Sequence, residues 1–242
     1  MTSSLIITID GPAGAGKSTV AKRLAHRMGL TYLDTGATYR ALAYAALKAG
    51  LNTTIDIPHL SRLARRLPLQ LRATSQGEVR VMLEGTDITH EIRTEEVSEA
   101  AAQVSQHSSV RAAMVALQRR LANRQGVPRL RSGRHPERSR RGGVVVEGRD
   151  TGSVVFPRAR FKFFLKANPA IRARRRQEEM THLYGRRPPL TQVREQLHFR
   201  DSLDQTRRVG PLVKPAGATV IDTSHRSVAQ VIQLMLRRIT RG

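Results

Sequence analysis

Residues 11–19 read GPAGAGKST and directly follow the apolar segment LIITID at residues 5–10. This apolar segment is rich in β-branched residues, which favours a buried parallel strand. After the glycine-rich loop, Val20, Leu24 and Met28 recur at intervals of four residues and therefore share one face of a predicted helix. The order of strand, glycine-rich loop and helix predicts an α/β fold built outward from this stretch.

The loop matches the pattern G-x-x-x-x-G-K-[ST] at Gly11, Gly16, Lys17 and Ser18. Glycines let backbone N–H groups turn around phosphate oxygens, and the helix that follows adds its N-terminal donors. The Lys17 ammonium can reach the β- and γ-phosphates of a nucleotide, and the Ser18 hydroxyl can ligate Mg²⁺. An ordinary glycine-rich turn is the alternative. We expect a nucleoside triphosphate to be bound by Gly11, Pro12, Ala13, Gly14, Ala15, Gly16, Lys17, Ser18 and Thr19.

The length and composition limit the other possibilities. The chain has 242 residues, enough for one large domain or for one domain that carries an inserted subdomain. It has no cysteine, which excludes disulfides, cysteine-ligated zinc and a thiol nucleophile. The N-terminus has no basic leader, and its apolar run is far shorter than a spanning helix of about 20 residues. We expect a cytoplasmic monomer that makes no membrane contact.

The formal net charge of +23 at pH 7 suits a polyanionic partner such as nucleic acid. However, only six of the 42 basic residues are lysine, and such a skew towards arginine can reflect genome base composition. Aromatic residues make up 4% of the chain and tryptophan is absent, so platforms for base stacking are scarce. We therefore do not expect nucleic-acid binding to be the main role.

A second polar cluster is predicted within residues 30–42, LTYLDTGATYRAL. We expect a short strand that ends at Asp34, a turn at residues 35–36, and a helix that carries Tyr39 and Arg40. This arrangement places a carboxylate, a phenol and a guanidinium at the carboxyl end of a strand, where open α/β sheets bind ligands. Arg40 could hold a second phosphate in a bidentate contact. A capped helix with a surface arginine is the alternative.

A third cluster follows the buried-strand pattern at residues 143–146. Residues 147–150 read EGRD, so charged groups again appear at the expected edge of the sheet. A salt-bridged turn is the alternative.

Two arginine-bearing helices are predicted after these strands. The first begins with Asn168 as N-cap and Pro169 in the first turn. The second places Arg200, Asp204 and Arg207 at positions i, i+4 and i+7, on one side. The breaker-rich segment YGRRPP joins the two helices, which favours a mobile lid that brings cations to a phosphoryl group and expels water. An exposed charged hairpin is the alternative.

Two further patterns lie between the second and third clusters. The segments LPLQLRA and EVRVMLEG alternate well enough for a short antiparallel hairpin. After them, Val110, Met114, Leu117 and Leu121 mark an amphipathic helix.

The chain resembles the bacterial cytidylate kinases in five segments that follow the order of that family. The resemblance implies a three-layer P-loop kinase fold with a mainly parallel sheet, and transfer of the γ-phosphate of ATP to CMP or dCMP with Mg²⁺. The rival functions are another small-molecule P-loop kinase and an ATP-dependent RNA-binding protein. The segments are ITIDGPAGAGKST (7–19), YLDTGATYRALA (32–43), VMLEGTDITHEIRTEEV (81–97), VEGRDTGSVVFP (146–157) and RDSLDQTRRVGPL (200–212).

The resemblance also implies how the chain is divided. The P-loop core takes residues 1–50 and 143–242, with a lid at about 168–190, and residues 51–125 form the CMP-binding insert. The family often has a serine against the cytosine edge where this chain has Ala102, and Ser105 or a water could take its place. The residues implied for CMP are Thr35, Tyr39, Arg40, Arg111, Gln118, Arg149, Asp150, Asp204 and Arg207. The residues implied for catalysis are Lys17, Asp150, Arg172 and Arg175, with Ser18 on the metal.

Residues 127–142, VPRLRSGRHPERSRRG, do not fit the family pattern. The segment has six arginines and two aliphatic residues, so it cannot bury enough apolar surface to fold alone. Lengthening a connection to about 20 residues costs only about 1.4 kcal/mol of loop-closure entropy. We expect a disordered, neutral insertion. The alternatives are an arm that binds RNA or the ribosome, and a segment that perturbs the CMP pocket.

Overall fold

The computed structural model describes residues 5–74, 79–123, 142–185 and 187–241. The expected insertion at 127–142 lies outside the described residues, apart from Gly142. No helix in these described ranges is long and apolar enough to cross a membrane.

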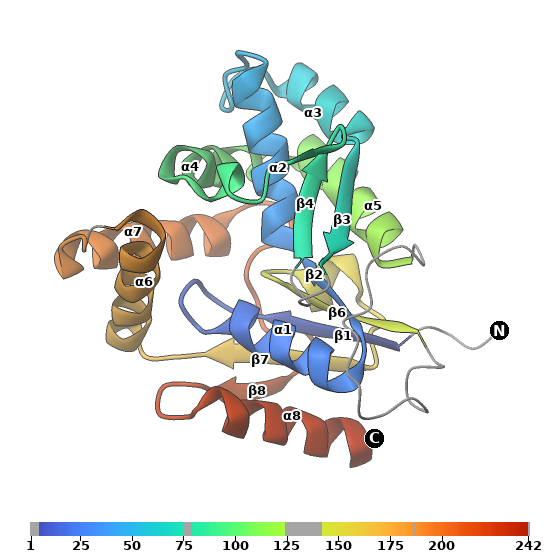
Figure 1. The fold of residues 1–242 in the computed structure, drawn as a ribbon, viewed down its shortest axis with the longest axis vertical. Helices are drawn as coiled ribbons and strands as arrows, with labels where there is room; N and C mark the ends of the chain where they lie inside the picture. The colour runs from blue at the N-terminus through green and yellow to red at the C-terminus, as the bar shows by residue number, and fades with distance from the viewer. Residues whose placement is uncertain (1–4, 75–78, 124–141, 186, 242) are drawn as a thin grey trace.

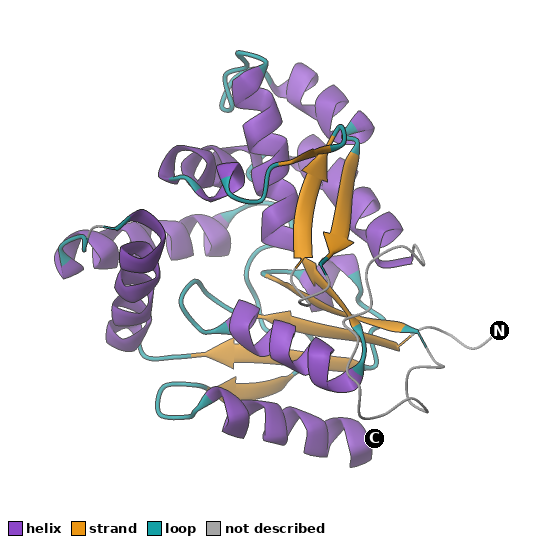
Figure 2. Cartoon of the chain, in the orientation of Figure 1, coloured by secondary structure: helices purple, strands orange, loops and turns teal. Residues whose placement is uncertain are grey.

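A five-stranded sheet forms the centre of the core, and every neighbouring pair of its strands is parallel (Figure 2). This confirms the predicted parallel sheet. The β6 strand continues past Val146 to Gly148, so Glu147 is a strand residue, opposite Ile9 on one side and Asp34 on the other. In spatial order the strands are β2 (Thr31–Asp34), β6 (Gly143–Gly148), β1 (Leu5–Asp10), β7 (Phe161–Lys166) and β8 (Thr219–Asp222).

Helices cover both faces of this sheet, as a three-layer fold requires. Val145 packs in one apolar cluster with helices α1 (Lys17–Met28) and α8 (Val228–Arg241). Val144 and Val146 point to the opposite face and pack with helix α2 (Thr35–Lys48). Because successive side chains of a strand point to opposite faces, the apolar run of β6 supplies both clusters.

The expected insert contributes to the second of these apolar clusters and stands above the sheet in Figure 1. Its strands β3 and β4 pair antiparallel, which confirms the predicted hairpin, and α5 buries all four of its predicted apolar residues. The elements of the insert are α3 (Ile57–Arg66), β3 (Leu69–Ala73), β4 (Val79–Leu83), β5 (Thr86–Asp87), η1 (Glu91–Arg93), α4 (Glu95–Val104) and α5 (Ser108–Asn123).

The expected lid consists of helices α6 (Pro169–Tyr184) and α7 (Leu190–Thr206), which lie beyond the carboxyl ends of the strands (Figure 1). Asn168 caps α6 by accepting a hydrogen bond from the Ala170 N–H at 2.9 Å, as predicted. An apolar cluster of both helices includes Ala13, so the lid packs directly on the glycine-rich loop.

Two local predictions were wrong. Helix α2 begins at Thr35 without a preceding turn, because the Asp34 carboxylate caps its first turn by accepting from the Ala37 N–H. Helix α7 ends at Thr206, and Arg207 is in an extended conformation instead of on the helix face. The Arg207 side chain nevertheless meets Asp204, at 3.2 Å.

Candidate active site

The glycine-rich loop leaves strand β1 through backbone conformations that only glycine adopts easily. Gly11 has φ +149°, and a Cβ there would overlap the carbonyl oxygen of Leu165 in β7. Gly14 has φ +73°, and a Cβ there would lie 2.8 Å from the carbonyl oxygen of Arg172 in α6. The loop is therefore fitted closely between the sheet and the lid, and its conformation depends on these two glycines.

Lys17 begins helix α1 and is buried beneath this loop. Its ammonium donates to the carbonyl oxygen of Pro12 at 2.8 Å. Burial, followed by the charge of Arg149, lowers the pKa of Lys17 to about 7. Because burial disfavours the ammonium form of Lys17, an anion placed beside it would strongly stabilise that form.

Glu147 stands next to Lys17 at the end of β6 and is buried. The Tyr32 hydroxyl donates a hydrogen bond to its carboxylate. Burial raises the pKa of Glu147 and the neighbouring Asp34 raises it further, whereas Lys17 opposes the shift. From the sequence, Glu147 was predicted only as one of four residues of a charged cluster at the edge of the sheet. Its position next to a buried strand was the signal that could have singled it out.

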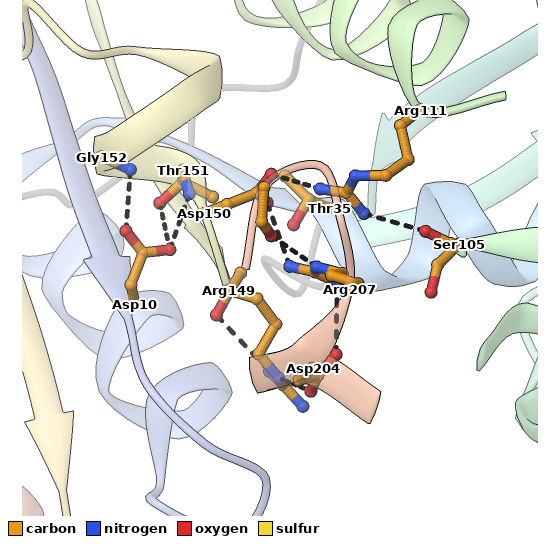
Figure 3. A network of polar contacts seen from close by, with 12 residues as sticks. Asp10, Thr35, Ser105, Arg111, Arg149, Asp150, Thr151, Gly152, Asp204 and Arg207 are labelled. Carbon is orange, nitrogen blue, oxygen red and sulfur yellow. Dashed lines mark hydrogen bonds and ion pairs between the residues drawn. The ribbon is translucent and has the colours of Figure 1, made fainter. Parts of the chain in front are cut away.

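In the same site, a buried network of arginines and aspartates joins three elements (Figure 3). Arg111 from α5 donates to the Asp150 carboxylate, and Arg207 lies 3.9 Å from the same carboxylate. Arg149 donates from Nε to Asp204 at 2.7 Å. Burial alone would raise the pKa of Asp204, but Arg149 and Arg207 lower it, so this carboxylate is held ionised.

Arg40 reaches the same region from helix α2. Its guanidinium donates to the Asp34 carboxylate at 2.8 Å, and both side chains are about one quarter exposed. Burial would raise the pKa of Asp34, but Arg40 and the Ala37 N–H lower it. Arg40 is thus held in place with part of its donor fork open to solvent.

One cavity of about 270 Å³ brings these groups together. It is lined by the glycine-rich loop, the ends of β2 and β6, the insert and both lid helices. Ala102 and Ser105 of the insert line it too. A larger open groove of about 940 Å³ lies beside β8 and α8 and holds none of the predicted site residues. The predicted site residues that line the first cavity are Ala13, Gly14, Lys17, Ser18, Thr35, Tyr39, Arg40, Arg111, Arg149, Asp150, Asp204 and Arg207.

Eight predicted site residues do not line this cavity. Five of them belong to the glycine-rich loop and the start of α1, namely Gly11, Pro12, Ala15, Gly16 and Thr19, and the other three make their hydrogen bonds elsewhere. Gln118 donates to the Thr38 hydroxyl at 3.0 Å and so joins α5 to α2. Arg172 donates to the carbonyl oxygen of Ala13 at 3.2 Å and supports the glycine-rich loop from behind. Arg175 makes both of its hydrogen bonds to Thr223, at 3.0 and 2.7 Å.

A family model for cytidylate kinase matches residues 7–241. The chain belongs to the cytidylate kinase family. Its relatives include the cytidylate kinase of Pelotomaculum thermopropionicum, 42% identical with 100% of this chain and 99% of the relative covered. The cytidylate kinase of Desulforamulus reducens is 40% identical with 100% of both chains covered. That of Geobacillus kaustophilus is 42% identical, with 98% and 96% covered.

Three arginines of this cytidylate kinase family member line the cavity but were not among the predicted site residues: Arg93 of η1, Arg176 of α6 and Arg200 of α7. Burial, followed by repulsion from Arg149, lowers the pKa of Arg200 to about 10, and the charges of Arg40 and Arg176 contribute. Four guanidinium groups therefore repel one another across the cavity, and an anion between them would relieve that repulsion. The i, i+4 spacing of Arg200 and Asp204 was the available signal for Arg200.

Proposed function

We propose that the protein transfers the γ-phosphate of ATP to CMP or dCMP, giving ADP and CDP or dCDP. One observation supports this assignment. A single cavity is lined by Ala13, Gly14 and Lys17 of the glycine-rich loop together with the Arg149–Asp204 and Arg111–Asp150 pairs. Two phosphate-bearing ligands can therefore meet there with their charges neutralised.

Phosphoryl transfer needs little covalent chemistry from the protein, so positioning and charge neutralisation supply most of the rate. The backbone N–H groups of residues 11–19 and the Lys17 ammonium hold the triphosphate of ATP. Arg40, Arg149 and Arg207 hold the phosphate of CMP, and their fixed positions direct an acceptor oxygen at the γ-phosphorus. Because these groups are set before the substrates bind, little reorganisation accompanies the reaction.

The other residues of the CMP site recognise the nucleoside. Arg111 presents donors and Asp150 presents an acceptor in the same buried pair, a combination suited to the edge of a pyrimidine. Ala102 and Ser105 lie in the same wall of the cavity. The Ser105 hydroxyl donates to the carbonyl oxygen of Ala102 at 2.8 Å, so it retains acceptor capacity for a base or a bridging water.

The oxygen atoms at and near Ser18 suit Mg²⁺, which is the metal that the family implies. Its hydroxyl lies beside the buried Glu147 carboxylate, and magnesium prefers such oxygen ligands together with phosphates and water. In the described residues, no group of three or more histidines, aspartates or glutamates could hold a metal ion, so phosphates and water would supply most ligands. When bound, the ion would neutralise charge on the β- and γ-phosphates.

The lid brings two further cations, and we assign this role to Arg176 and Arg200. Arg172 and Arg175, the lid residues expected from the sequence, act behind the loop and at Thr223. Closure of α6 and α7 over both ligands would exclude water and protect the γ-phosphate from hydrolysis. The cytoplasmic location and the monomeric state remain predictions.

A screen of phosphate acceptors tests this function. Release of ADP from ATP is measured with CMP, dCMP, UMP or AMP as the acceptor, and with none. We expect CMP or dCMP to stimulate release far above the other two. Strong stimulation by AMP or UMP instead would favour another small-molecule kinase. Salt-dependent RNA binding without stimulation by any acceptor would favour an ATP-dependent RNA-binding protein.

A further inference from the structure

Asp10 is the last residue of β1, directly before the glycine-rich loop, and it is fully buried. Its Oδ1 accepts hydrogen bonds from the Thr151 N–H and the Thr151 hydroxyl, each at 2.8 Å. Its Oδ2 accepts a third from the Gly152 N–H at 2.7 Å. Figure 3 shows these contacts to the left of the arginine and aspartate network, with Thr151 next to Asp150.

The three bonds hold a short π-helical turn, η3 (Thr151–Val155), whose first N–H groups have no partner within the turn. Asp150 occupies the capping position of this turn, but its side chain makes no capping bond. Asp10 replaces that cap from another strand. The Asp150 carboxylate is consequently left for Arg111 and Arg207 in the acceptor site.

Burying the Asp10 carboxylate is unfavourable for folding, which indicates that its contacts serve a function. Burial raises the pKa of Asp10, and the nearby charge of Asp150 adds to that effect, while the bonds from Thr151 and Gly152 oppose it. The turn also fits tightly, because a Cβ at Gly152 would lie 2.8 Å from the Thr8 hydroxyl oxygen. The position of this segment relative to β1 therefore has little freedom.

We propose that Asp10 is a positioning residue that fixes the distance between the ATP loop and the acceptor site. Its backbone continues into Gly11 of the loop, and its side chain holds the residues that immediately follow Arg149 and Asp150. This inference rests on the proposed function, because it concerns where CMP lies relative to ATP. Asp10 itself is not among the residues that line the cavity.

Asp10→Asn tests the proposal, because the asparagine amide has the shape of the carboxylate but points an N–H donor at a backbone N–H donor. We expect the KM for CMP to rise about tenfold, as when a buried hydrogen-bonding group loses its partner. The dissociation constant of ATP, measured without acceptor, should stay within about twofold. Thr151→Val removes only one of the three bonds and should raise the KM for CMP by a smaller factor.

Thr8→Val is the matched control. Thr8 is buried on the same strand and its hydroxyl has no hydrogen-bond partner within the described structure, so both constants should be unchanged. Equal shifts of the CMP and ATP constants in Asp10→Asn, or an unchanged KM for CMP, would overturn the proposal. If Asp10→Asn does not fold, the same comparison of the KM for CMP with the dissociation constant of ATP in Thr151→Val tests the proposal. Absence of CMP-stimulated ADP release in the wild type would instead overturn the proposed function, and this inference with it.

Discussion

Arg111 donates a hydrogen bond to the carboxylate of Asp150 and thereby joins helix α5 of the insert to the end of strand β6 in the core. The Arg111 side chain is only 2% exposed and that of Asp150 only 9%. Since Arg111 belongs to the insert and Asp150 to the core, their pair fixes the spacing between these two parts where they line the cavity. The Arg111–Asp150 pair also couples the position of the insert to that of the core.

Replacing Arg111 with alanine should impair the use of CMP far more than that of ATP. The substitution leaves Asp150 buried with only Arg207 nearby, and breaking such a buried pair typically costs about 3–5 kcal/mol. We expect the KM for CMP to rise about 100-fold or more, while the KM for ATP stays within about threefold. Arg120→Ala, on the exposed face of the same helix, should behave as wild type. Unchanged CMP kinetics would remove Arg111 from the acceptor site.

Replacing Lys17 with alanine should abolish turnover without unfolding the protein. Lys17 is the buried cation of the loop, and losing one preorganised contact to a developing charge costs about 10²- to 10³-fold in kcat. The unfolding temperature should change little, because the loss of the hydrogen bond to the Pro12 carbonyl oxygen is offset by the removal of a lysine whose charged form burial disfavours. A coupled assay of ADP release, with the exposed Lys48→Ala as control, measures the loss. Near-normal rates would refute the role.

The same lysine predicts a pH dependence of ATP binding. With a pKa of about 7, Lys17 of the ligand-free protein is mostly neutral at pH 8, and the triphosphate favours its charged form. ATP binding should therefore take up protons at pH 8 and weaken as the pH rises above about 7. Calorimetry in buffers of different ionisation enthalpy measures the uptake. Equal uptake in Lys17→Ala would contradict the assignment.

The lid arginines can be separated by substitution. Arg176 lines the cavity, whereas Arg175 is bonded to Thr223 and Arg174 is exposed. We expect Arg176→Ala to lower kcat by about tenfold or more, since arginines placed on the transferring group contribute much of its stabilisation. Arg175→Ala should have a smaller effect and Arg174→Ala none. A larger loss in Arg175→Ala would restore the assignment made from the sequence.

These arginines show what the sequence could and could not determine. The parallel sheet, the phosphate-binding loop and the amphipathic helix at Val110 to Leu121 depend on local patterns, and the structure contains all three. Adjacent helix positions such as Arg175 and Arg176 point about 100° apart, and only tertiary packing decides which one faces the cavity. Periodicity therefore located the lid helices but not their functional faces.

The buried polar groups were harder still to predict. Glu147 and Asp10 both end strands whose apolar pattern indicates burial, but their partners lie more than a hundred residues away in the chain. Arg207 lies just beyond the end of helix α7 and still contacts Asp204, at 3.2 Å. Such contacts depend on the relative placement of strands and helix ends, which a local pattern does not contain.

The transfer itself is the central claim, and ATP labelled on its γ-phosphate measures it directly. The label should appear in the β-phosphate of CDP or dCDP, with one ADP formed for each labelled product, and this transfer should be lost in Lys17→Ala. Label released as inorganic phosphate at a rate that CMP and dCMP do not change would contradict the account.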